Sequence, residues 1–249
     1  MSASKRGSLV VIGSGPGIGL NVASTFAANG FSRIYLISRN EKRLESDKAT
    51  VLARSGRHNV NIETLSADIS DIDSLRAALQ KIDNRSYPVE AVFFNAARVE
   101  ASSLLQYPIE EVERDFRVRP NFSCVCESAA DCLFQISVSA LIEVARWAVP
   151  LLKFNASVIA KPSILVTNSF LYKTPRADGF SLSVTKAAQR TLVQCMNKDF
   201  CADGIHAGLI SVGGVVYDDH PTRNVENIAQ KTWKFFAKGD HNELEVEIV

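Results

Sequence analysis

Short apolar segments alternate with amphipathic segments along the whole chain, and this alternation most limits the folds open to it. The apolar segments are rich in Val, Ile and Leu, as the buried strands of a parallel sheet are. They lie at residues 9–13, 33–38, 60–66, 91–95, 164–168 and 206–212, with a seventh expected near 244–249. Between them, helical patterns occupy residues 17–29, 41–55, 71–84, 138–154, 180–202 and 225–237.

This order of elements predicts an α/β fold in which helices cover both faces of a mostly parallel sheet of about seven strands. Gly30 and Gly56 end the first two helical patterns, as glycine does after many helices. No linker rich in proline or glycine divides the chain, and no internal repeat is present. We therefore expect one doubly wound domain over residues 1–249.

Composition excludes several classes of function. The chain has 28 Lys and Arg against 27 Asp and Glu, so it lacks the basic surface of a nucleic-acid binder. No apolar run is long enough to span a membrane, and the first residues lack the apolar core of a secretory signal. The five cysteines form no CxxC pair, which argues against a bound metal and for a reducing compartment. A cytoplasmic protein is expected.

A glycine-rich turn follows the first predicted strand and opens the first helix. Residues 13–19 read Gly-Ser-Gly-Pro-Gly-Ile-Gly, and residues without Cβ let backbone N–H groups approach a phosphate at the positive end of a helix. The spacing is Gly-x-x-x-Gly-x-Gly rather than G-x-G-x-x-G, because Ile18 stands where the third glycine would be. This spacing resembles that of the short-chain dehydrogenase/reductase family, which implies a Rossmann-type domain that binds NAD(P).

Three further motifs extend the resemblance over nearly the whole chain. Asp68-Ile69 matches the aspartate that contacts adenine in the family, and Asn95-Ala96-Ala97 resembles its Asn-Ala-Gly. Val-Gly-Gly-Val at residues 212–215 resembles the turn that touches the nicotinamide amide. The resemblance therefore implies a cofactor site made of Gly13, Ser14, Gly17, Ile18, Gly19, Asp68, Ile69, Asn95, Ala96 and Val215, together with the residues that follow the second strand.

Ser38 and Arg39 end the second predicted strand, where an acidic residue would bind the adenosine ribose and repel a 2′-phosphate. A hydroxyl and a guanidinium suit a phosphate instead, so NADP(H) is favoured over NAD(H). The alternative is an ordinary solvated arginine at a strand end.

The catalytic residues match the family only in part. In the family, a tyrosine exchanges a proton with the substrate, a lysine four residues later holds the nicotinamide ribose, a serine steadies the substrate oxygen, and an asparagine holds a relay water. Lys186 and Ser169 match the lysine and the serine, but Leu182 replaces the tyrosine and Ser137 lies near the asparagine position. A positioned acid is worth about 10² to 10⁴ in rate, so ordinary chemistry of the family would be impaired.

Three functions remain open. The first is an NADP(H)-dependent oxidoreductase acting on a small carbonyl, imine or alcohol, with Tyr172 as the candidate replacement acid and Tyr217 as a second candidate. The second is a non-redox catalyst, an isomerase or cyclase, that uses Ser169 and Lys186. The third is a pseudoenzyme that binds NADP(H). The Leu-x-x-x-Lys pattern resembles a branch of the family in filamentous fungi, which implies a substrate from secondary metabolism.

Residues 118–135 interrupt what would otherwise be one helix, and they contain Pro120 and three of the five cysteines. Every valine codon begins with GT and one glutamine codon ends with AG, so a retained in-frame intron is one hypothesis. A disordered lineage-specific loop is the other, because Cys124, Cys126 and Cys132 form a poor zinc site. The family often dimerises through this helix, so the segment is expected to disturb a homo-oligomer.

Overall fold

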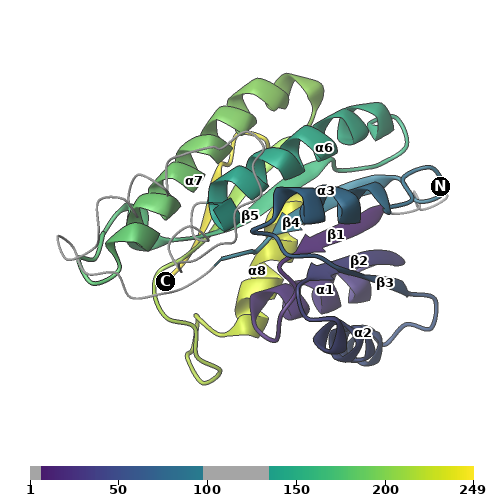
Figure 1. Cartoon of the computed structure of the whole chain (residues 1–249), viewed down its shortest axis with the longest axis horizontal. Coiled ribbons are helices and arrows are strands. Elements are labelled where there is room, and N and C mark those ends of the chain that lie inside the picture. Colours follow the sequence, from purple (N-terminus) through teal and green to yellow (C-terminus); the bar gives the residue numbers. More distant parts are fainter. Residues whose placement is uncertain (1–6, 98–134) are drawn as a thin grey trace.

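The computed structural model describes residues 7–97 and 135–249, which form a seven-stranded sheet between two layers of helices (Figure 1). All paired strands are parallel, in the order β3-β2-β1-β4-β5-β6-β7. The strands are β1 (Ser8–Ile12), β2 (Arg33–Ser38), β3 (Asn61–Ser66), β4 (Val89–Phe94), β5 (Ser163–Ser169), β6 (His206–Val212) and β7 (Glu245–Ile248). The predicted α/β, Rossmann-type fold is confirmed.

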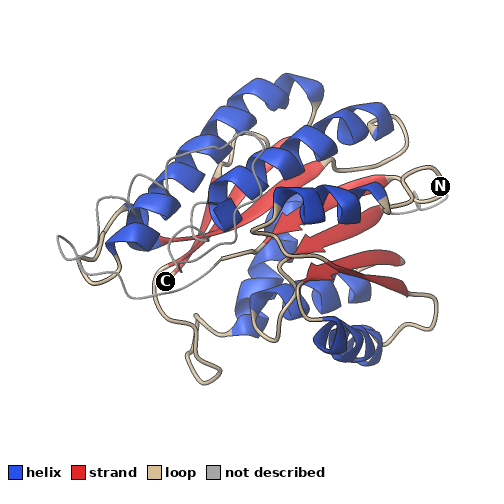
Figure 2. Cartoon of the chain, in the orientation of Figure 1, coloured by secondary structure: helices blue, strands red, loops and turns tan. Residues whose placement is uncertain are grey.

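The described helices cover both faces of the sheet (Figure 2). One face carries α1 (Ile18–Ala28), α2 (Glu41–Ser55) and α8 (Val225–Lys238), and the other carries α3 (Ile72–Gln80), α6 (Ala140–Asn155) and α7 (Phe180–Phe200). The period-2 alternation of a strand explains the two cores. Leu9 and Val11 of β1 pack with residues of α1, α2 and α8, whereas Val10 and Ile12 pack with residues of α3, α6 and α7. Within the described residues, no helix is long and apolar enough to cross a membrane.

Side-chain caps explain where the helices begin and end. The Asn40 side chain accepts from the backbone N–H of Arg43 at the start of α2, and Gly56 ends that helix in the left-handed region at φ 62°. The helix predicted at residues 71–84 ends earlier, at Gln80. The Asp83 carboxylate accepts from the backbone N–H groups of the two residues after Asn84, and such a local turn competes with helical bonding.

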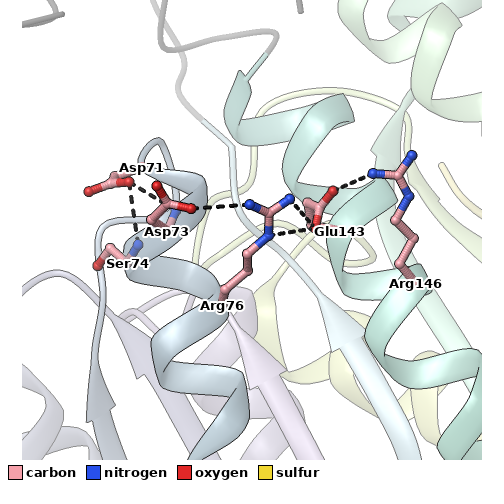
Figure 3. Close-up of polar contacts among 6 residues, drawn as sticks. All are labelled: Asp71, Asp73, Ser74, Arg76, Glu143 and Arg146. Carbon is pink, nitrogen blue, oxygen red and sulfur yellow. Dashed lines mark hydrogen bonds and ion pairs between the residues drawn. The ribbon is translucent and has the colours of Figure 1, made fainter. Parts of the chain in front are cut away.

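Helices α3 and α6 are joined by a charged cluster at the surface (Figure 3). The guanidinium of Arg76 donates to the Glu143 carboxylate at 2.9 Å, and Arg146 donates to the same carboxylate at 2.6 Å. These hydrogen bonds, that from Arg76 above all, hold the pKa of Glu143 below its usual value. Asp71 caps α3 beside the cluster, because its side chain accepts from the backbone N–H groups of Asp73 and Ser74.

Strand β1 has β2 on one side and β4 on the other, so the chain reverses its direction of winding at this point. In open α/β sheets, such a switch point leaves a crevice beyond the carboxyl ends of the strands, where ligands bind. Two short turns shape this end of the sheet: η1, a π-helical turn (Gln135–Ser139), and η2, a 3-10 turn (Phe170–Tyr172).

Candidate active site

The glycine turn after β1 is packed tightly on one side and open on the other. A Cβ on Gly13, which has φ 87°, would lie 2.6 Å from the backbone nitrogen of Ala96, and a Cβ on Gly19 would lie 2.7 Å from the carbonyl oxygen of Gly13. A Cβ on Gly15 or Gly17 would meet no atom within 4 Å. Gly13 and Gly19 therefore allow close packing within the turn. Gly15 and Gly17 leave the backbone on the other side uncovered by side chains.

A cavity of about 440 Å³ lies in this crevice. It is lined by Pro16, Gly17, Ile18, Asn95, Val216, Asp218 and Val225. The residues that begin α1 border it, so the positive end of that helix faces the space in which a pyrophosphate would lie. Two predicted cofactor residues near it lie at different depths, since Ala96 is buried and Val215 is 56% exposed. The residues present fit a dinucleotide, and among the lining residues that the structure describes Asp218 is the one whose charge opposes a phosphate.

Ser14 and Asn95 support the turn through their side chains. The Ser14 hydroxyl donates to the Asp47 carboxylate of α2 at 2.8 Å, and both residues are buried. The Asn95 amide donates to the Gly13 carbonyl at 3.1 Å. Ser14 was predicted to bind the cofactor, but the structure turns its hydroxyl toward α2. Asp47 was not predicted, because a lone aspartate in a charged helix carries no sequence signal for burial.

Buried polar atoms without a partner lie where β2 passes into α2. Among the described residues, the Ser38 hydroxyl and the Nε of Arg43 are buried and have no hydrogen-bond partner, and Arg39 is exposed. The Asp68 carboxylate accepts from the backbone N–H of Ser70 at 3.0 Å and from its hydroxyl at 2.7 Å. Ile69 beside it is buried. Arg43 was missed in the sequence, although it follows Arg39 by four residues.

Lys186 lies in the interior at the carboxyl end of β5. Its side chain is buried, and its ammonium donates to the Thr167 carbonyl at 3.0 Å and to the Gln189 amide oxygen at 2.9 Å. Burial lowers the pKa of Lys186 from its ordinary 10.5 to about 8, because a desolvated ammonium is disfavoured. The amine is thus close to half-protonated under mildly alkaline conditions.

Lys186 belongs to a chain of hydrogen bonds that crosses the carboxyl ends of three neighbouring strands. The Thr167 hydroxyl donates to the Asn95 side-chain oxygen at 2.9 Å, and Asn95 donates in turn to Gly13. On the other side, the Gln189 amide donates to the Ser137 carbonyl of η1 at 3.0 Å. One network therefore connects the glycine turn, β4, β5, α7 and the π-helical turn.

No acid stands one helical turn before Lys186. Leu182 occupies that place and is buried, at 8% exposure. Ser183 does not replace the acid, because its hydroxyl donates to the Gly179 carbonyl at 2.9 Å. Ser169 follows β5 as predicted, and its hydroxyl oxygen caps η2 by accepting from the backbone N–H of Leu171 at 3.4 Å.

Tyr172, the predicted replacement acid, is engaged elsewhere. Its hydroxyl donates to the Glu245 carboxylate of β7 at 2.8 Å. The Arg190 guanidinium lies 4.6 Å from the centre of the Tyr172 ring and also contacts Glu245, at 3.4 Å. The Tyr172 hydroxyl is therefore bonded to β7, whereas the Lys186 ammonium is bonded to Thr167 and Gln189. Tyr217, the second candidate, is 55% exposed.

The segment predicted as an intrusion, residues 118–135, lies outside the described residues except for its last residue, which begins η1.

Comparison with known proteins agrees with this geometry. A family model described as short chain dehydrogenase matches residues 8–226. An uncharacterized oxidoreductase from Thermotoga maritima is 27% identical over 117 residues, which is 47% of this chain and 44% of that protein, so the match spans less than half of the relative.

Two solved structures share the fold over nearly the whole chain. A short-chain dehydrogenase from Sphingobium yanoikuyae in complex with NADPH has a TM-score of 0.74 at 19% identity, over 97% of this chain and 87% of its own. An NADPH-dependent reductase involved in bacilysin biosynthesis has a TM-score of 0.78 at 18% identity, over 97% of this chain and 96% of its own.

Proposed function

Because this chain belongs to the short-chain dehydrogenase/reductase family, we propose that it transfers a hydride between NADP(H) and a small organic carbonyl, imine or alcohol. The observation that carries the proposal is the network from the glycine turn to Lys186. It links the buried Lys186 ammonium, through Thr167 and Asn95, to the turn that begins α1. Such a link supports one dinucleotide whose ribose lies near Lys186 and whose pyrophosphate lies at the helix N-terminus.

Three polar groups support NADP(H) rather than NAD(H). The unpartnered Ser38 hydroxyl and Arg43 Nε both lie where β2 passes into α2, and the exposed Arg39 lies between them in sequence. A phosphate on the adenosine ribose would give these groups an acceptor that a bare ribose lacks. The two similar solved proteins are described with NADPH, which agrees with this choice.

NADPH supplies hydride chemistry when it is bound, and the residues of this chain hold it and the substrate. Lys186 would donate to the nicotinamide ribose, since two of its three N–H donors are used within the described residues and one is left. Ser169 would donate to the substrate. Its hydroxyl oxygen accepts from the Leu171 N–H, and within the described residues its hydroxyl proton has no acceptor.

The buried Leu182 decides which acceptor fits this site best. Reduction of a ketone leaves an alkoxide, which needs a proton from a positioned acid. Hydride addition to an iminium carbon moves the C=N electron pair onto nitrogen and neutralises it, so no proton is needed. We therefore propose iminium ions, including imines that are already protonated, ahead of ketones as substrates. A substrate from secondary metabolism, as the fungal resemblance implies, belongs to the same proposal.

A second candidate function rests on the ionisation of Lys186. A pKa of about 8 leaves part of the amine neutral near physiological pH, and a buried neutral amine can act as a general base. A non-redox isomerase or cyclase would use this base directly. Such an enzyme would convert its substrate without consuming NADPH, and this distinguishes it from the proposed oxidoreductase.

NADPH binding to the purified protein tests the first proposal. We expect micromolar affinity for NADPH, weaker binding of NADH, and a loss of about tenfold in NADPH affinity for Arg39→Ala or Arg43→Ala. Lys198→Ala is the matched control, because this exposed lysine lies near the end of α7, by the amino ends of the strands. Absence of binding to either nucleotide would refute the proposal.

A further inference from the structure

A glutamine of α7 is buried where this helix meets the π-helical turn η1. Gln189 of α7 has 0% exposure, its amide oxygen accepts from Lys186 at 2.9 Å, and its amide nitrogen donates to the Ser137 carbonyl at 3.0 Å. Burial of an amide is unfavourable unless its polar atoms are paired. Both polar atoms of Gln189 are paired, so its burial leaves neither atom unsatisfied.

The partners allow only one orientation of this amide. Lys186 offers N–H donors and no acceptor, and the Ser137 carbonyl offers an acceptor and no donor. In a flipped amide, the NH2 group would face the Lys186 ammonium, donor against donor, and the amide oxygen would face the Ser137 carbonyl, acceptor against acceptor. Gln189 therefore forms a directed bridge from the ammonium to the π-helical turn, across 52 residues of sequence.

We infer that Gln189 is a positioning residue that fixes the direction of the Lys186 ammonium at the carboxyl end of β5 and bridges it to the Ser137 carbonyl. The inference deepens the proposed function, since it rests on Lys186 as a group that holds the nucleotide. Lysine has a long flexible side chain, and a second anchor besides the Thr167 carbonyl restricts where its remaining N–H points.

The bridge also has a chemical consequence. An amide neither releases nor takes up a proton at neutral pH, so Gln189 holds Lys186 without conducting protons to Ser137. Leu182, four residues before Lys186 in α7, has no proton to give either. Within the part of the chain that the structure describes, neither Gln189 nor Leu182 passes a proton to Lys186, which suits an acceptor that is already cationic.

The test measures the ionisation of Lys186 in the protein without nucleotide. Urea unfolding is followed from pH 7 to 10.5 for the native chain, Gln189→Glu and Gln189→Met, each with and without Lys186→Met, so that the difference reports Lys186 alone. We expect Gln189→Glu to move the Lys186 transition to higher pH, because a carboxylate favours the ammonium. We expect Gln189→Met to move it to lower pH, because an acceptor is lost.

Gln194→Met on the same helix is the matched control and should leave the transition unchanged. A mere loss of packing at position 189 would lower stability at every pH without moving the transition. A transition at the same pH in both Gln189 variants would overturn the inference.

NADPH affinity is measured on the same proteins. Gln189→Met should bind NADPH about tenfold more weakly than the native chain, since a group that orients a charged donor is lost. Unchanged affinity would also overturn the positioning role. Failure of the native chain to bind NADPH would refute the proposed function instead, and the unfolding data would still decide whether Gln189 holds Lys186.

Discussion

Replacement of Lys186 by methionine gives the sharpest test of the site, because it removes a buried charge while keeping a long side chain. The folded protein holds the Lys186 pKa near 8, whereas an unfolded chain has the ordinary 10.5. Each tenfold change in acidity is worth about 1.4 kcal/mol, so the protonated lysine lowers the free energy of unfolding by about 3 kcal/mol below pH 8.

The sign follows from proton binding. Between pH 8 and 10.5, the unfolded state keeps the proton and the folded state has released it, so the contribution of Lys186 to stability rises with pH by about 3 kcal/mol. In Lys186→Met, the free energy of unfolding lacks this increase with pH, because methionine does not titrate. It also leaves the Thr167 carbonyl and the Gln189 oxygen without their donor, which costs about 1–3 kcal/mol at every pH.

Urea unfolding at several pH values from 7 to 10.5 measures both effects. We expect the native chain and Lys186→Met to have similar free energies of unfolding at pH 7, and the native chain to be more stable by a few kcal/mol at pH 10.5. Subtraction of the two curves cancels the other lysines and the tyrosines, which titrate in both proteins. A difference that stays constant across this range would refute a buried lysine with a lowered pKa.

Three other predictions concern the glycine turn, the cap of α3 and the residue before Lys186. Gly13→Ala should lower the free energy of unfolding, measured in urea, by at least about 2 kcal/mol, because its Cβ would lie 2.6 Å from the backbone nitrogen of Ala96. Gly15→Ala should leave the free energy of unfolding unchanged and weaken NADPH binding. Equal stability of these two variants would contradict the packing described for the turn. Asp71→Ala should lower the free energy of unfolding, measured by thermal denaturation, by about 1 kcal/mol. Asp71→Asn should lower it much less, since asparagine also caps helices. Equal losses in the two variants would show that the cap does not cause the effect. Leu182→Tyr should raise ketone reduction by about 10² or more, measured as NADPH consumption, and no gain would show that the missing acid is not the limiting feature.

The sequence predicts the fold well because its signals are local. Helix α2 occurs where expected, at Glu41–Ser55, since Asn40 and Gly56 are strong cap residues on either side. The prediction for α3 extends to residue 84, beyond its end at Gln80, because the competing turn is made by the Asp83 side chain, whose partners a pattern does not reveal.

The site is predicted only where residues lie in one motif. The glycine turn and Lys186 are found by spacing, but Gln189 is not, because three residues beyond a lysine it looks like an ordinary polar residue of a helix. Its burial depends on a π-helical turn far away in sequence. Tyr172 is the converse case: it lies near Ser169 in sequence, yet its hydroxyl is paired with β7.

The strand order also bears on how the chain is made. Strands β3, β2, β1 and β4 are adjacent in the sheet and are all translated before the second half of the protein, so they are able to assemble while synthesis continues. Strand β5 pairs with the free side of β4 only after the ribosome has passed the long stretch from Phe94 to Ser163. Until then, β4 presents an open row of backbone donors and acceptors, and such an edge invites pairing with another nascent chain.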